Sequence, residues 1–479
     1  MSQYVENNLR PSYDQVIVEI ADYVLNYQIN NPNAYEIARL CLLDALGCGM
    51  LALNFIECTK LLGPIVPNAI LSCGARVPGT SYELDPVQAA FNIGTMIRWL
   101  DFNDTWLAAE WGHPSDNLGA ILAVADYVGR NNLSKTSITM RDVLEMMIKA
   151  YEIQGCLALK NSFNSVGLDH VILVKLASSA VAAKLLGANR DQLLCTLSNV
   201  LVDGQSLRTY RHAPNAGTRK SWAAGDATAR AVRLALITMT GEMGYPSALT
   251  VPKWGFYDAS FAGKQFEIAR PYTSYVIENI LFKIAYPAEF HAQTAVECAI
   301  KLHSLVKERL EEISKIEIKT HASAIRIISK QGPLYNPADR DHCLQYMIAV
   351  SLLHGNLAAE HYADLVATNP VIDRLRATMH VVEDLDFSRD YLDPEKRSIA
   401  NSIQIFFNDG SCTDLVTVEY PLGHNRRRAE GLPLLLEKFK NNLRTRFSRG
   451  RATGIFDIMN DKKHLENMLL IDFMTLWQV

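Results

Sequence analysis

Residues 99–117 hold the densest group of side chains that could do chemistry. The segment reads W-L-D-F-N-D-T-W-L-A-A-E-W-G-H-P-S-D-N, so Asp101, Asp104, Thr105 and His113 stand among three tryptophans. Carboxylates and an imidazole between apolar rings can exchange protons, because burial and neighbouring charges shift their pKa values. The same polar groups could instead cap a helix and bond loop amides. The residue types alone leave an acid–base site and a capped helix junction both open.

Residues 208–220, R-T-Y-R-H-A-P-N-A-G-T-R-K, form a cationic segment. Its charged or titratable side chains are Arg208, Arg211, His212, Arg219 and Lys220. Fixed cations just before a helix suit a polycarboxylate, because arginine binds carboxylates through paired hydrogen bonds and a helix N-terminus attracts anions. A solvated basic loop has the same composition, so charge alone favours neither interpretation.

Further candidate side chains stand singly in the sequence. They are His170 at the start of an apolar segment, Lys283 and His291 on either side of Tyr286-Pro287, and Arg340 and His342 before another apolar segment. Taken one at a time, each is explained more simply as a capping, buried or solvated side chain. The phosphate-binding glycine loops, Gly-x-Ser-x-Gly and His-Glu-x-x-His were not found in the sequence. The spacing of histidines and acids predicts no metal site.

Helices are expected to position these side chains. Asn31-Pro32 and Asp85-Pro86 each combine an N-cap residue with a proline at the first helical position. Alanine-rich apolar segments favour helices that pack closely. The predicted helices of the first half cover 37–53, 87–100, about 169–186 and 223–240. From residue 15 to about 270 the pattern is helical.

The pattern changes near residue 270. Residues 313–320 alternate apolar and polar side chains, which predicts a half-buried strand. Asn408-Asp409-Gly410 separates two strand-like segments and predicts a hairpin. Helical patterns lie at 293–307 and 341–353, and again after Gly423 at 432–443 and 463–477. Residues from about 275 to 425 are therefore expected to form a smaller α+β unit.

Composition limits the class of protein. The chain has 479 residues, of which 49% are hydrophobic, and its formal net charge is −4, which argues against disorder and against nucleic-acid binding. The nine cysteines are scattered, as buried thiols of a reducing compartment are. No uncharged apolar stretch of 18 residues occurs, so no membrane partner is expected. The first ten residues lack the features of a signal or transit peptide, which predicts a cytoplasmic location.

From about residue 9 to its end, the sequence resembles the MmgE/PrpD family. The resemblance is carried by D-F-N-D-T-W…G-H-P-S-D-N-L-G-A-I-L, by D-G-Q-S-L-R-T-Y-R-H-A-P-N-A-G-T-R-K-S-W-A-A-G-D-A (203–227), and by G-Y-P-S-A-L-T (244–250), N-P-A-D-R-D-H-C-L-Q-Y-M (336–347) and D-P-E-K-R-S-I-A-N-S-I (393–403). It implies a mostly α fold, in which a large all-helical domain carries an inserted smaller α+β lid domain. The helical domain would consist of residues 1–274 and 426–479, and the lid of residues 275–425.

The resemblance also implies an activity. Members of the closest-matching branch remove water from 2-methylcitrate to give 2-methyl-cis-aconitate in the methylcitrate cycle of propionate breakdown. They use neither a metal nor an organic cofactor, and side activity on citrate or cis-aconitate is expected because these lack only a methyl group. The expected partners are a tricarboxylate substrate and a second copy of the chain. Two alternatives stay open: a lyase that decarboxylates cis-aconitate, as in another branch of the family, and a non-catalytic anion-binding scaffold.

The resemblance and the basic segments together predict the site residues. The predicted catalytic residues are His113, His170, Asp101, Lys220 and Lys283. The predicted substrate-binding residues are Thr105, Arg208, Arg211, Arg219, His212, Glu289, His291 and Arg340. A histidine follows the start of the lid in the decarboxylase branch, and either Glu289 or His291 could take its place here.

Overall fold

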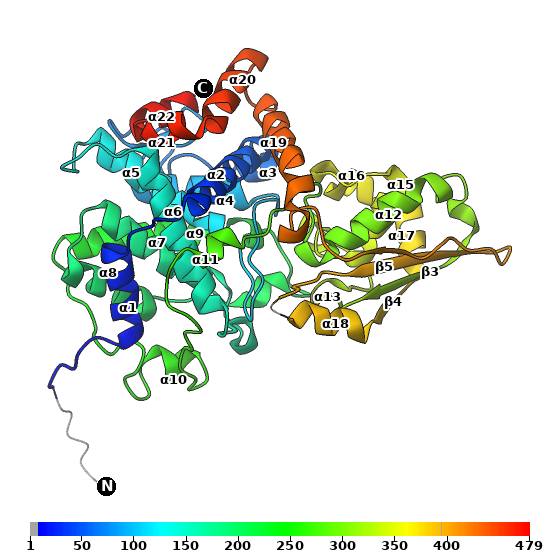
Figure 1. Ribbon diagram of the computed structural model, residues 1–479, viewed down its shortest axis with the longest axis horizontal. Coiled ribbons are helices and arrows are strands. Elements are labelled where there is room, and N and C mark those ends of the chain that lie inside the picture. Colours follow the sequence, from blue (N-terminus) through cyan, green and yellow to red (C-terminus); the bar gives the residue numbers. More distant parts are fainter. Residues whose placement is uncertain (1–7, 394) are drawn as a thin grey trace, which may run out of the picture.

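The computed structural model describes residues 8–393 and 395–479. Most of the N-terminal segment used to argue for a cytoplasmic location, residues 1–7, lies outside this part of the chain. The fold is mostly helical with one small mixed sheet, which confirms the predicted fold class. Figure 1 shows two lobes, a larger one of helices and a smaller one that contains the sheet. Each lobe has its own cluster of buried hydrophobic side chains.

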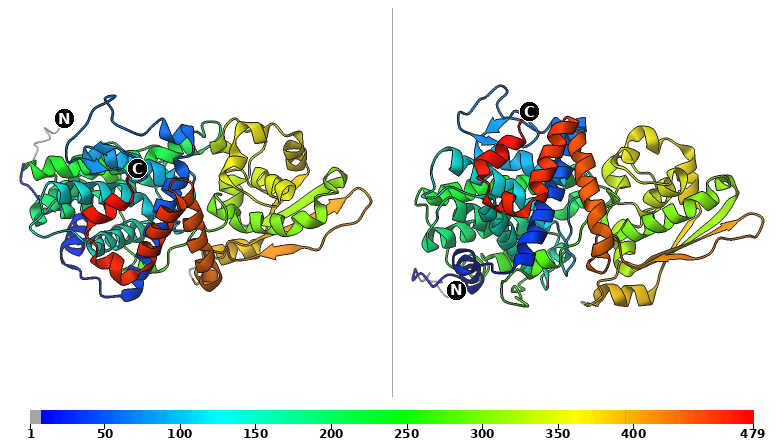
Figure 2. Two further views of the ribbon diagram at one scale, coloured as in Figure 1. Left: turned by 90° about the horizontal axis from the view of Figure 1, so that it is seen from above. Right: turned by 45° about the horizontal axis from the view of Figure 1, so that its top comes forward.

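The larger lobe, called here the helical lobe, is built from two separate parts of the chain. Its first part contains α1 (Gln15–Asn26), α2 (Pro32–Ala52), α3 (Ile56–Thr59), α4 (Pro86–Arg98), α5 (Leu118–Arg130), α6 (Met140–Ala158), α7 (Val171–Leu185), α8 (Arg190–Val202), α9 (Arg219–Met239), α10 (Phe256–Ser260) and α11 (Tyr275–Glu278), with the short antiparallel pair β1 (Ala75–Arg76) and β2 (Glu83–Leu84). Its second part contains α19 (Arg428–Arg444), α20 (Arg449–Asn460), α21 (Lys462–Asn467) and α22 (Leu470–Leu476). Figure 2 shows α19, coloured orange, returning alongside the blue α2, against which it packs.

The predicted N-caps are confirmed, and one predicted helix is wrong. The side chain of Asn31 accepts a hydrogen bond from the backbone of Asn33, and that of Asp85 accepts two at the start of α4. The single helix predicted over 463–477 is instead the pair α21 and α22. The chain is extended between them because the backbone oxygen of Met468 accepts a hydrogen bond from Met140, the first residue of α6, and the backbone N–H of Leu470 donates one to Ile138. Within the described residues, no helix is long and apolar enough to cross a bilayer.

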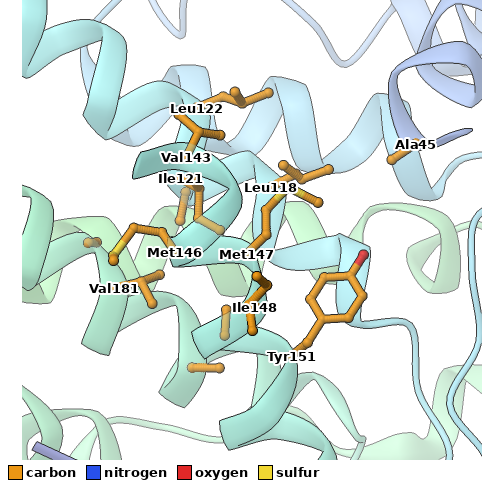
Figure 3. Packing of buried hydrophobic residues seen from close by; sticks show 14 of the residues in the cluster. Ala45, Leu118, Ile121, Leu122, Val143, Met146, Met147, Ile148, Tyr151 and Val181 are labelled. Atoms are coloured by element: carbon orange, nitrogen blue, oxygen red, sulfur yellow. The ribbon is translucent and has the colours of Figure 1, made fainter. Parts of the chain in front are cut away.

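Helices α4, α5 and α9 cross at glycines. A Cβ atom on Gly225 of α9 would lie 2.6 Å from the carbonyl oxygen of Phe91, and one on Gly119 of α5 would lie 2.7 Å from that of Ala90. The backbones can therefore approach one another only where a side chain is missing. This crossing fixes the end of α4 relative to the starts of α5 and α9. Figure 3 shows hydrophobic packing in the same lobe, to which α6 contributes Met147, Ile148 and Tyr151.

The smaller lobe, called here the mixed lobe, packs helices against a four-stranded sheet. Its elements are α12 (Gln293–Val306), β3 (Ile313–Thr320), α13 (Ala322–Ile328), α14 (Pro337–Arg340), α15 (Leu344–His354), α16 (Asp364–Ala367), α17 (Pro370–Ala377), β4 (Met379–Glu383), α18 (Leu385–Leu392), β5 (Asn401–Phe407) and β6 (Val416–Val418). The strand order is β4-β3-β5-β6, in which β3 and β4 are parallel and the other pairs antiparallel. The structure confirms the predicted strand 313–320, which is β3. It also confirms the hairpin predicted around Asn408-Asp409-Gly410, whose two strands are β5 and β6. The isoleucines of β3 and β5 face the helices of this lobe.

Candidate active site

A small buried cavity lies between the two lobes and gathers most of the predicted site residues. Its volume is about 20 Å³, which holds roughly one or two water molecules. The lining residues are Arg98, Asp101, Thr105, Leu107, Trp111, His113, His170, Arg208, Arg211, His212 and Lys283 from the helical lobe or its connection, and Glu289, Phe290, Ile327 and His342 from the mixed lobe. The side chains that could do acid–base chemistry and those that could bind anions therefore share one space.

The first set of charged groups, called here the Asp101 group, consists of Arg98, Asp101, His113 and Lys283. Oδ1 of Asp101 accepts hydrogen bonds from Nη1 of Arg98, at 2.6 Å, and from Nζ of Lys283. Burial opposes ionisation of Asp101, but Arg98 and Lys283 outweigh it and hold the pKa of this carboxyl well below its usual value. Asp101 is therefore a carboxylate shared by two cations. Its φ of 50° is in the left-handed region, which aspartate tolerates better than most residues do.

His113 is bonded at both ring nitrogens. Its Nδ1 lies 2.7 Å from the backbone oxygen of Asp104 and 3.2 Å from the hydroxyl of Thr105. Its Nε2 lies 2.9 Å from Nη2 of Arg98. Burial and the nearby Arg98 lower the pKa of His113 well below the ordinary value, so the ring is neutral.

The loop that carries His113 is held by a buried carboxyl. Asp104 accepts hydrogen bonds from the backbone and hydroxyl of Ser115, at 3.1 and 2.8 Å, and from the hydroxyl of Tyr151, at 2.5 Å. Tyr151 stands on α6 within the packing of Figure 3. Burial raises the pKa of Asp104 to about 6. Asp104, which sequence analysis grouped with the candidate acids, therefore ties the loop to the hydrophobic core.

The second set, called here the Asp169 group, consists of Asp169, His170, Arg208 and Arg211. Arg211 donates two hydrogen bonds to Asp169, one of them from Nη2 at 3.1 Å, and Nη1 of Arg208 lies 3.8 Å from the same carboxylate. His170 precedes α7, and its ring lies 5.8 Å from that of His113, centroid to centroid. Among the described residues, neither ring nitrogen of His170 has a hydrogen-bond partner. Burial lowers its pKa well below the ordinary value.

Glu110 and Trp111 position Arg208. Oε2 of Glu110 accepts two hydrogen bonds from Asn164, each 2.8 Å, and its Oε1 lies 3.6 Å from Nη1 of Arg208. Burial raises the pKa of Glu110 to about 7. The guanidinium of Arg208 lies over the ring of Trp111 at 5.1 Å, and Arg326 of the mixed lobe lies 5.8 Å from the same ring. Trp111 therefore contacts cations of both lobes.

Glu289 and His291, the two candidates at the start of the mixed lobe, differ in their access to the cavity. Glu289 lines the cavity, whereas His291 is fully buried behind it and does not. Nδ1 of His291 lies 2.7 Å from Glu289, and Nε2 lies 3.0 Å from the hydroxyl of Tyr391. Burial opposes a charge on His291, but Glu289 outweighs it and raises the pKa of the imidazole to about 10. His291 therefore holds Glu289 from behind the cavity wall, and its role in substrate binding stays a prediction.

Lys220 lies one contact away from the cavity. Its Nζ reaches across to the mixed lobe, where it bonds Asp341, the backbone oxygen of Ala338 at 3.1 Å and Nδ1 of His342 at 2.8 Å. The other ring nitrogen of His342 lies 3.9 Å from Asp101. Burial lowers the pKa of Lys220 to about 8. Lys220 thus links the lobes through His342, which lines the cavity.

Two predicted substrate-binding arginines do not line the cavity. Arg219 is on the first turn of α9, where it pairs with Asp226 at 3.0 Å and lies over Trp222. Arg340 donates to the backbone oxygen of Tyr362 and to Asp364, both at 2.7 Å. Both guanidinium groups have partners within their own lobe, so the structure does not bring these two predicted residues to the cavity.

Several residues that line the cavity were not predicted from the sequence. They are Arg98, Leu107, Phe290 and Ile327, together with His342, which taken alone was explained more simply as a capping, buried or solvated side chain. Arg98 stands one helical turn before Asp101, on the same face of the chain, and that spacing was an available signal. The apolar residues carry no signal of this kind, because a lining leucine or isoleucine has the same sequence pattern as one in the core.

The fold and the cavity define a two-lobed protein in which imidazoles, carboxylates and fixed cations from both lobes surround one buried space. The chain belongs to the MmgE/PrpD family. The family's N-terminal domain matches residues 18–269, and its C-terminal domain matches residues 286–462.

Three individual relatives match this chain over at least 92% of their own length. The chain is 59% identical to the 2-methylcitrate dehydratase of Escherichia coli K12 over 478 residues, which is 99% of each chain. It is 59% identical to that of Cupriavidus necator over 484 residues, 100% of each chain. It is 54% identical to a relative from Yarrowia lipolytica named "2-methylcitrate dehydratase, mitochondrial", over 100% of this chain and 92% of the relative.

Proposed function

We propose that this protein is a hydro-lyase that converts 2-methylcitrate into 2-methyl-cis-aconitate and water. The observation that carries the proposal is the placement of two neutral imidazoles, His113 and His170, with ring centroids 5.8 Å apart in a cavity lined by four fixed cations. Full-length identity of 59% to several curated 2-methylcitrate dehydratases supports the same activity. Dehydration of 2-methylcitrate is a step in propionate breakdown, so we assign the protein to that metabolism.

The reaction needs both kinds of group. The proton that leaves is α to a carboxylate, and the departing group is a tertiary hydroxide, so an acceptor, a donor and a sink for negative charge are all required. We assign the acceptor and donor to His113 and His170. Arg208, Arg211 and Lys283 hold the carboxylates and stabilise the charge that develops on them. Thr105, His212 and Glu289 complete the wall around the substrate.

Asp101 and Lys220 position other side chains of the cavity through hydrogen bonds. Asp101 holds Arg98 and Lys283 in place, and Lys220 fixes His342 against the helical lobe. These side chains supply the acid, the base and the cations of the reaction. Turnover is therefore expected to be the same with and without a chelator.

Substrate entry requires the lobes to separate. A cavity of about 20 Å³ is far smaller than the several hundred Å³ of typical ligand pockets. We infer that the unit from about 275 to 425 acts as a lid on the domain formed by 1–274 and 426–479. Saturating 2-methylcitrate should slow hydrogen exchange of backbone amides in this unit, because the substrate holds it closed. Unchanged exchange at saturation would contradict a closing lid.

One assay tests the proposed function. The conjugated product absorbs in the ultraviolet, so 2-methylcitrate should give a rising absorbance, and citrate a slower one. Release of carbon dioxide from cis-aconitate, without water loss from 2-methylcitrate, would favour the decarboxylase alternative. Tight binding of tricarboxylates without any turnover would favour a scaffold. A homodimer and a cytoplasmic location stay predictions, which light scattering and cell fractionation check.

A further inference from the structure

Arg98 makes two directional contacts inside the cavity. It ends α4 and is only 3% exposed. Its Nη1 donates to Asp101 at 2.6 Å, and its Nη2 lies 2.9 Å from Nε2 of His113. Its Nε has no hydrogen-bond partner among the described residues and lies 4.0 Å from Asp116. The guanidinium therefore connects the carboxylate and the imidazole of the Asp101 group.

We propose that Arg98 is a positioning residue that keeps His113 neutral with its lone pair on Nε2, which makes His113 the proton acceptor of the dehydration. This inference rests on the proposed function and goes beyond it, because it decides which of the two histidines receives the proton.

The hydrogen-bond partners fix the tautomer of His113 from both sides. The backbone oxygen of Asp104 can only accept, so Nδ1 must carry the proton in their 2.7 Å contact. The Nη2 group of Arg98 can only donate, so Nε2 must present a lone pair. A proton added at Nε2 would be repelled by the N–H of the guanidinium that points at the same nitrogen. These two contacts therefore accommodate one form of the His113 ring, with the proton on Nδ1.

The charges around the ring favour the same form. The charged or titratable groups that face His113 are Arg98 from α4, Asp101 and Asp104 from the loop, His170 at the start of α7 and Lys283 from the connection to the mixed lobe, with His342 of the mixed lobe behind Asp101. Arg98, Lys283 and His170 oppose a positive ring, and Asp101 favours one. Burial adds to the opposition, so the cations prevail.

Substrate binding frees the lone pair. A carboxylate is a stronger acceptor for a guanidinium than a neutral imidazole is, so a substrate carboxylate in the cavity draws Arg98 toward itself. The proton α to a carboxylate then moves to Nε2, and its electron pair forms the carbon–carbon double bond as the carbon–oxygen bond breaks. The carboxylates of the bound substrate offset the cations around His170, so this ring takes up one proton from solvent when the substrate binds. The departing hydroxide takes that proton from His170 and leaves as water. Proton transfer from His113 back to His170, directly or through solvent, restores the enzyme.

Two variants test the proposal through the pH profile of kcat/KM with 2-methylcitrate. In Arg98→Gln the opposing charge is lost, so the acid limb should move to higher pH by about one to three units. In Arg98→Lys the charge stays, so the acid limb should stay near that of the wild type. A folded Arg98→Gln protein with reduced activity and an unshifted acid limb would overturn the proposal, as would an equal shift in both variants.

A measurement on the unaltered chain avoids the risk that a variant fails to fold. Protein labelled with ¹⁵N-histidine, with His113 assigned through His113→Asn, should show Nδ1 protonated and Nε2 unprotonated at neutral pH. The opposite tautomer, or a doubly protonated ring, would contradict the role of Arg98. Absence of wild-type turnover would instead count against the proposed function, so the two failures are distinguishable.

Discussion

The Asp101 group and the Asp169 group contain the same kinds of side chain, but their histidines differ in hydrogen bonding. Each contains a histidine, an aspartate and two cations, and in each the aspartate is shared by the cations. In the Asp101 group both ring nitrogens of His113 have partners. In the Asp169 group neither ring nitrogen of His170 has one among the described residues. One imidazole is thus held in a single form, and the other is free to respond to what enters the cavity.

This difference assigns complementary roles to the two groups. A ring whose tautomer is fixed before the substrate arrives pays little reorganisation when it accepts a proton. The ring of His170, whose Nδ1 lies 3.4 Å from Asp169 without a hydrogen bond, can bond the substrate itself, and the substrate's anionic charge would raise its pKa toward that of a donor. The Asp101 group therefore suits the proton acceptor, whereas the Asp169 group suits binding of a carboxylate and proton donation.

The largest expected effect comes from removing the fixed ring. His113→Ala should lower kcat by about 10²- to 10⁴-fold, because one acid–base group contributes that much. Steady-state kinetics by product absorbance measures it, and circular dichroism checks the fold. His380→Ala, which alters an exposed histidine on β4, is the control and should leave turnover unchanged. Near-normal turnover of His113→Ala would remove this group from the mechanism.

An intermediate effect is expected from the Asp169 group. Nη1 of Arg208 has no hydrogen-bond partner among the described residues, and a hydrogen bond between charged groups contributes about 1.5–3 kcal/mol. Arg208→Met should therefore raise KM by about 10- to 150-fold, with a smaller change in kcat. Arg219→Met is the matched control, since Arg219 does not line the cavity, and its KM should be unchanged. Equal effects of the two substitutions would contradict a specific carboxylate site at Arg208.

The smallest expected effect is a pH dependence of KM that acts through Arg208. Burial raises the pKa of Glu110 to about 7, so above this pH the carboxylate forms and competes with the substrate for Arg208. KM of the wild type should rise above pH 7, by up to about tenfold per pH unit for a single proton. Glu110→Gln cannot ionise, so its KM should stay flat over the same range. Parallel KM profiles of the two proteins would show that Glu110 does not influence binding.

Several features of the fold could be predicted because they depend on nearby residues. Asn31 and Asp85 cap helices through amides two or three positions away, and the alternation of 313–320 marks the strand at its observed bounds. The break between α21 and α22 could not be predicted, because it depends on pairing with a segment more than 300 residues earlier. Local signals therefore failed where a distant backbone competed for the hydrogen bonds.

In the candidate site, too, some residues could be predicted from the sequence, whereas the contacts of others depend on tertiary packing. The positions of His113, His170 and Lys283 were identified from motifs that recur in the family. The orientation of Arg340 toward Tyr362 and that of His291 toward Glu289 depend on the packing of the mixed lobe. Arg98 lies in the site because α4 ends next to the loop that carries His113, where the guanidinium contacts the imidazole.

The sequence by itself determined most of the helices, the strand at 313–320 and the hairpin that contains β5, since caps, periodicity and turn residues act within a few positions along the chain. It also determined which chemistry the protein has at hand: imidazoles, carboxylates and several fixed cations. Only the tertiary structure decided which of these groups meet and in which protonation state. Hydrogen bonds such as that from Lys283 to Asp101 join residues 182 positions apart, and burial in a shared cavity shifts pKa values that no local pattern encodes.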